Sequence, residues 1–115
     1  MIQEEDGGEH LRRWTRHRID VRLKVSVAGH QADGPVFGRA NNLSLGGLGA
    51  YIPHSIAVGS NVLLELSFPN APDDLKVNAV VRSCDGFRYG LEFLQMPYEV
   101  RAIIEKSCEA APPLS

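Results

Sequence analysis

The 115-residue chain has few of the residues that build disulfide scaffolds or metal centres. Its two cysteines, Cys84 and Cys108, lie far apart and form neither a C-x-x-C pair nor a zinc-type spacing. A chain of this length buries a modest core without disulfide bonds, so we expect both to be reduced thiols. The four histidines are scattered without metal-ligand spacing. The sequence therefore predicts no metal and no cofactor.

Long apolar segments are also missing. No run approaches the roughly 18 apolar residues of a membrane span. Residues 1–9 are acidic and contain glycine, unlike a signal or transit peptide. We therefore expect a cytoplasmic protein without membrane insertion.

The chain lacks an excess of positive charge, with 12 basic residues against 14 acidic residues. Four of the basic residues are arginines within residues 12–18, which leaves eight basic against 14 acidic residues elsewhere. Non-specific binding to nucleic acid grows with the number of phosphates that the protein neutralises. A binder of single strands would also need aromatic stacking platforms beside a basic groove. This distribution favours a small anion held at one basic spot and argues against nucleic acid.

Alternation of apolar and polar residues dominates the middle of the chain. It predicts six extended segments, at residues 19–27, 36–45, 48–52, 62–68, 75–81 and 87–93. Short turns between them indicate an all-β antiparallel barrel or sandwich. After Gln95 the period becomes helical, and Pro112 and Pro113 end that helix. We expect a disordered lead at 1–10, one domain at 11–108 and a flexible tail at 109–115.

The first candidate site is the arginine segment. Arg12 and Arg16 are four residues apart, so their side chains lie on the same side of an extended or helical segment, and Arg13 is beside them. A guanidinium group can bind phosphate oxygens or the O6 and N7 edge of guanine through two parallel hydrogen bonds. The alternative is a solvated basic tail. Trp14 is a candidate either to stack on a purine or to anchor the segment on the barrel.

The second candidate site is the pattern Asn42-x-Ser44-x-x-Gly47, which offers an amide, a hydroxyl and a permissive backbone. These residue types are also ordinary in turns, where their side chains bond their own backbone. No G-x-S-x-G turn surrounds Ser44, and no pair of titratable groups has a spacing typical of a catalytic site. An enzyme is therefore not expected.

Read together, these two motifs resemble the PilZ domain, a bacterial receptor for cyclic di-GMP. The similarity extends to residues 80–82 and 89–93, which look like late strands of the family, and to the final helix. The resemblance implies a six-stranded antiparallel β-barrel with one C-terminal helix. It further implies that the ligand cyclic di-GMP is bound by six residues: Arg12, Arg13, Arg16, Asn42, Ser44 and Gly47. The family often has Asp at position 42, where a carboxylate accepts from two guanine N–H groups at once.

The expected mechanism is non-enzymatic. The N-terminal segment becomes ordered around cyclic di-GMP, and this change is passed to an unidentified effector protein. The alternative is a PilZ-like module that interacts with other proteins without any ligand.

Overall fold

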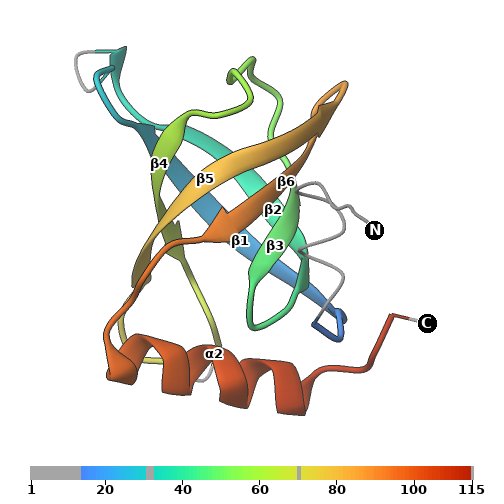
Figure 1. Cartoon of the computed structure of the whole chain (residues 1–115). Coiled ribbons are helices and arrows are strands. Elements are labelled where there is room, and N and C mark those ends of the chain that lie inside the picture. Colours follow the sequence, from blue (N-terminus) through green and yellow to red (C-terminus); the bar gives the residue numbers. More distant parts are fainter. Residues whose placement is uncertain (1–13, 31–32, 70, 115) are drawn as a thin grey trace, which may run out of the picture.

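The computed structural model describes residues 14–30, 33–69 and 71–114. Its strands are β1 (His17–Val27), β2 (Val36–Leu43), β3 (Gly47–Tyr51), β4 (Asn61–Leu66), β5 (Leu75–Asp85) and β6 (Arg88–Phe93). They form a closed barrel in the order β1-β2-β3-β6-β5-β4, and every neighbouring pair is antiparallel (Figure 1). The predicted six-stranded barrel is thus confirmed, and the sandwich is excluded.

The core consists of the inward residues of the alternating pattern. In β1, for example, Val21, Leu23 and Val25 are buried, while Asp20 and Arg22 between them face solvent. The largest fully buried side chains come from all six strands, from the segment after β3 and from the final helix: Leu23, Val25, Leu43, Leu48, Ile52, Leu64, Leu66, Val77, Val81, Leu91 and Ile104. Since successive side chains of a strand point to opposite faces, every outward position is left free for a site on the barrel's outer surface.

Helix α2 (Tyr98–Ala110) lies across one end of the barrel (Figure 1). Its buried residues, Ile104, Ser107 and Cys108, recur at the spacing of one helical face. Within the described ranges, no helix is long and apolar enough to cross a lipid bilayer.

The end of the chain differs from the flexible tail that the sequence predicts from residue 109. Residues 109 and 110 belong to α2, and residues 112–114 run beside the start of β1. The Arg18 N–H donates to the Pro112 carbonyl at 2.8 Å, and the Leu114 N–H donates to the Arg16 carbonyl at 3.0 Å. This edge of β1 is available because β4 pairs only with residues 23–27. The proline pair ends the helix but does not prevent strand pairing, because Pro113 lies between the two residues that bond.

Burial of Cys108 gives a pH dependence that can be measured. Desolvation, and then the nearby carboxylates of Glu105 and Glu109, raise the thiol pKa from an ordinary value of 9.0 to about 11. The unfolded chain therefore releases this proton first as the pH rises. We expect this contribution to the free energy of unfolding to be present below pH 9 and to be lost between about pH 9 and 11.

Urea denaturation from pH 7.5 to 10.5 measures this decline. Cys108→Ala should flatten the profile. Cys84→Ala is not a neutral control here, because the Cys84 thiol contributes to the raised pKa of Tyr89. An equally steep profile in Cys108→Ala would contradict the assignment.

Candidate ligand-binding pocket

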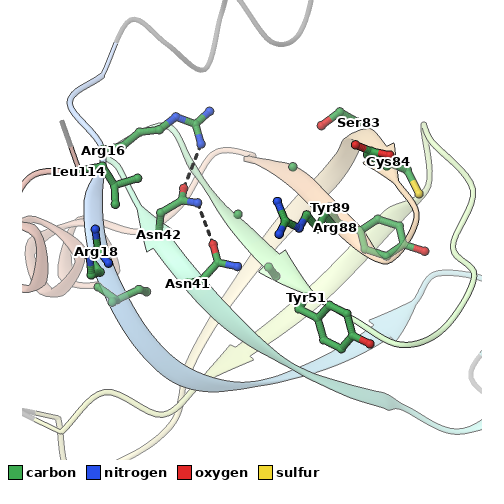
Figure 2. Close-up of a pocket in the computed structure, with 15 residues that line it drawn as sticks. Arg16, Arg18, Asn41, Asn42, Tyr51, Ser83, Cys84, Arg88, Tyr89 and Leu114 are labelled. Carbon is green, nitrogen blue, oxygen red and sulfur yellow. Dashed lines mark hydrogen bonds between the residues drawn. The ribbon is translucent and has the colours of Figure 1, made fainter.

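An open pocket of about 910 Å³ lies on the outer surface of the barrel. Its walls come from the start of β1, the end of β2, β3, and the hairpin of β5 and β6 (Figure 2). It therefore draws together residues that are up to 98 positions apart, from Arg16 to Leu114.

The floor of the pocket has almost no side chains. Across the neighbouring strands, Asn42 of β2 pairs with Gly49 of β3, Gly49 with Gly90 of β6, and Gly90 with Ser83 of β5. Two glycines therefore lie side by side in outward positions, where other residues would project a side chain. A Cβ atom added to Gly49 would collide with the amide of Asn42. Gly49 thus lets the Asn42 amide lie against the sheet, and Gly90 adds no side chain beside it.

Irregular strand pairing surrounds this floor. One extra residue interrupts β1 between Arg18 and Val21, β2 between Ala40 and Asn42, and β5 between Val81 and Ser83. The pairings of β4 with its two neighbours are regular. A bulge changes the direction of the side chains that follow it. The bulge in β2 lets both Asn41 and Asn42 line the pocket.

Arg16 and the two asparagines form a hydrogen-bonded chain along one wall. The Arg16 guanidinium donates to Asn42 Oδ1 at 2.9 Å, and Asn42 Nδ2 donates to Asn41 Oδ1 at 2.8 Å (Figure 2). Backbone bonds to Pro112 and Leu114 hold the segment on either side of His17. The structure thus brings together two of the predicted site residues, Arg16 and Asn42, although they lie 26 positions apart.

The pocket carries positive charge in an acidic chain. Its lining includes Arg16, Arg18 and Arg88, against one acid, Asp85. The whole chain has a formal net charge of -2. Among the described residues, no group of three or more His, Cys, Asp or Glu is arranged to hold a metal ion. The lining therefore suits an anion that offers hydrogen-bond acceptors to guanidinium groups.

Ser44 and Gly47 lie beside this pocket but are not part of its lining. Ser44 is buried, and its hydroxyl accepts from the N–H groups of Gly46 and Gly47, both at 3.2 Å. Gly47 is also buried, at the first position of β3, and its φ is not positive. In this arrangement both residues shape the turn between β2 and β3.

That turn also seats Trp14. A Cβ atom on Gly46 would collide with the indole ring of Trp14, so only glycine allows this close approach. The ring is half-buried and borders two shallow grooves near α2. The sequence left two roles open for Trp14, stacking on a purine or anchoring the segment on the barrel. In this structure the ring packs on the barrel at the β2–β3 turn. Arg12 and Arg13 lie outside the described residues, immediately before it.

Sequence reasoning missed Asn41, Gly49, Gly90 and Arg88 as pocket residues. Arg88 and Gly90 follow the outward alternation of β6, which looks like an ordinary solvent face. The one available signal was a glycine at an outward position in each of two predicted strands, since glycine in a strand often marks a close approach. It became meaningful only once the register showed that the two glycines are neighbours.

The family model of the PilZ domain matches residues 10–110. The chain belongs to the PilZ domain family. No curated protein matches it. Solved structures similar to this PilZ domain include the PilZ domain of CeSA from a cellulose-synthesizing bacterium. The TM-score is 0.65 at 14% identity, with 83% of this chain and 95% of that chain covered.

Two further structures share the fold. The PilZ domain of YcgR from Escherichia coli, solved with c-di-GMP, has a TM-score of 0.70 at 18% identity, with 86% of this chain and 89% of that chain covered. The Bacillus subtilis inhibitor of motility, MotI/DgrA, has a TM-score of 0.67 at 15% identity, with 84% of this chain and 48% of that chain covered. At these identities the similarity shows the fold.

The contact between Gly46 and Trp14 can be tested by fluorescence, because Trp14 is the only tryptophan. Gly46→Ala should displace the indole ring from the turn, shift its emission to longer wavelength and increase quenching by acrylamide. Gly59→Ala is not a suitable control, because Gly59 has a φ of 96°, and a residue with a side chain would strain the backbone there. Val58→Ala, at an exposed site away from the indole, is the matched control. An unchanged spectrum in Gly46→Ala would show that Trp14 does not rest on this turn.

Proposed function

We propose that this PilZ domain is a non-enzymatic receptor that binds cyclic di-GMP in the glycine-floored pocket. The observation that carries the proposal is the Arg16 guanidinium, held by Asn42 Oδ1 at 2.9 Å at the edge of a floor that includes Gly49 and Gly90. A flat ligand with two purines and two phosphates needs such a floor, with cations at its rim. The YcgR domain of the same fold, solved with c-di-GMP, supports this choice of ligand.

The Arg16 guanidinium has the geometry to bind an anion or a guanine edge. Guanidinium has five N–H groups, and an anion or guanine edge can use two of them at once. Asn42 is held in place by its neighbours Arg16 and Asn41, so its amide is already oriented before the ligand arrives. In the proposal Arg12 and Arg13, from the same segment as Arg16, add contacts to phosphate or base.

Ser44 and Gly47 complete the proposed site. The hydrogen bonds of Ser44 support a role through the turn: they hold the backbone that seats Trp14 and, with it, the segment that carries the arginines. A direct contact with the ligand would require the Ser44 hydroxyl to exchange a bond within the turn.

The proposed output is a change at the N-terminal segment. Arg12 and Arg13 close over the ligand, and the new surface is recognised by an effector protein. Because Arg16 is tied through its carbonyl to Leu114, movement of this segment also reaches the C-terminal strand pairing. Charge neutralisation by the ligand provides the driving force.

Isothermal titration calorimetry with cyclic di-GMP tests the proposal. We expect binding near the micromolar range, about -8 kcal/mol, after the cost of ordering the segment. Arg16→Ala and Arg12→Ala should each weaken binding by about tenfold or more, since a guanidinium pair contributes about 1–3 kcal/mol. Arg82→Ala is the control, because Arg82 pairs with Glu92 at 2.6 Å and does not line the pocket.

Unchanged affinity in both Arg16→Ala and Arg12→Ala would refute the assignment of the site. Turnover of cyclic di-GMP during prolonged incubation would show that the protein is an enzyme, and it would refute the proposal of a non-enzymatic receptor.

A second candidate function is a PilZ module that interacts with proteins without a ligand. The similarity to MotI/DgrA, an inhibitor of motility, favours it, because inhibition of a motility system requires contact with another molecule. Absence of binding heat with cyclic di-GMP, in a folded sample, would select this function.

A further inference from the structure

The pocket has a second charged wall that neither motif accounts for. We infer that Arg88, together with the ring of Tyr51, forms a second guanine subsite on the side of the floor away from Arg16. This inference rests on the proposed function, because it concerns the second base of the same ligand. It names residues of β3 and β6 that lie outside both sequence motifs.

The position of Arg88 follows from the strand register. Arg39 of β2 pairs with Tyr51 of β3, and Tyr51 pairs with Arg88 of β6. These three residues form an outward row next to the row that contains Gly49 and Gly90. Figure 2 shows Arg88 and Tyr51 across the open floor from Arg16 and Asn42.

The charge of Arg88 is available to a ligand. Arg39 donates to Asp20 at 2.7 Å, and Arg82 donates to Glu92 at 2.6 Å, so these two arginines are neutralised. Arg88 is exposed, and its side chain makes no ion pair or hydrogen bond with any residue that the structure describes. Asp85, its backbone partner in the β5–β6 pairing, makes no ion pair with it. Among the described residues, the Arg88 guanidinium therefore has no carboxylate partner at the rim of the pocket.

The distance across the floor fits a ligand with two bases. Asn42 and Gly90 are separated by two strand spacings, about 10 Å, since adjacent strands lie about 4.8 Å apart. Arg88 projects from the far strand, two residues before Gly90. A purine held by Arg16 and Asn42 covers the near half of the floor. The second purine of the same ligand then falls within reach of Arg88.

Tyr51 supplies an aromatic surface beside Arg88. Tyr51 is 50% exposed, on the outer face of the barrel. The ring is held by an edge contact with Phe87, with ring centroids 6.2 Å apart and planes at 86°. An exposed, held aromatic ring next to a guanidinium group is the arrangement that stacks on a base. Because stacking on an aromatic ring accepts any base, the discrimination between guanine and adenine depends on Arg88.

Guanine and adenine differ at the edge that arginine reads. Guanine presents two acceptors, O6 and N7, to the guanidinium fork, whereas adenine presents an amino donor in place of O6. Arg88 should therefore prefer guanine at the far subsite. A mixed cyclic dinucleotide with one guanine and one adenine separates the two subsites, because its guanine can occupy only one of them at a time.

The experiment is calorimetry of four proteins with cyclic di-GMP and with cyclic GMP–AMP. Wild type should prefer cyclic di-GMP at least about fivefold. Arg88→Ala should bind cyclic di-GMP about tenfold more weakly, and its preference should fall to about twofold, the statistical advantage of two identical bases. Tyr51→Leu should weaken both ligands equally. Arg39→Ala, the matched control on the other side of Tyr51, should behave like wild type.

The outcomes separate this inference from the proposed function. If wild type binds cyclic di-GMP and Arg88→Ala keeps both the affinity and the preference, the second subsite is wrong and the receptor function stands. If the wild type binds neither ligand, both the receptor function and the second subsite are overturned. Arg88→Lys keeps the charge but loses the fork. If it retains the full preference for guanine, Arg88 contacts phosphate, and the guanine assignment is overturned.

Discussion

The pocket depends on one constraint: Gly49 and Gly90, in adjacent strands and opposite each other, carry no side chains on the outer face of the barrel. A closed barrel directs alternate residues outward around its whole circumference, and those residues ordinarily cover the backbone. Where two neighbouring outward positions are glycine, the sheet itself becomes the floor of a depression. Asn42 rests against this floor, and the arginines stand around its edge.

The charges of the lining support our proposal of an anionic ligand. The arginines on the remaining outer surface include two that are paired with carboxylates, whereas those of the pocket outnumber the single acid of its lining. A local positive field on an acidic chain attracts a small anion to one place. The same overall charge repels a polyanion that would have to contact a larger part of the surface. The size of the pocket and the charge of the chain therefore both support the small anionic ligand that we propose.

The sequence predicted the strands and the helix, because period-2 and helical alternation are local signals. Its motifs also singled out Arg16 and Asn42, which the structure brings into hydrogen-bond contact. It did not predict which outward residues are neighbours, since that depends on register and on three bulges. One bulge also concealed the end of β5, which continues to Asp85 beyond the predicted residue 81, because the alternation breaks there. Ser44 was ambiguous from the start, because turns and ligand sites use the same polar residues, and here its hydroxyl bonds within the turn.

The strand pairing of residues 112–114 with β1 has a practical consequence for anyone who handles this protein. Leu114 lines the pocket, so this segment forms part of its rim. A bulky side chain in place of Leu114 would narrow the pocket beside the arginines. A small fluorophore attached to a cysteine at position 114 would instead be well placed to report changes inside the pocket.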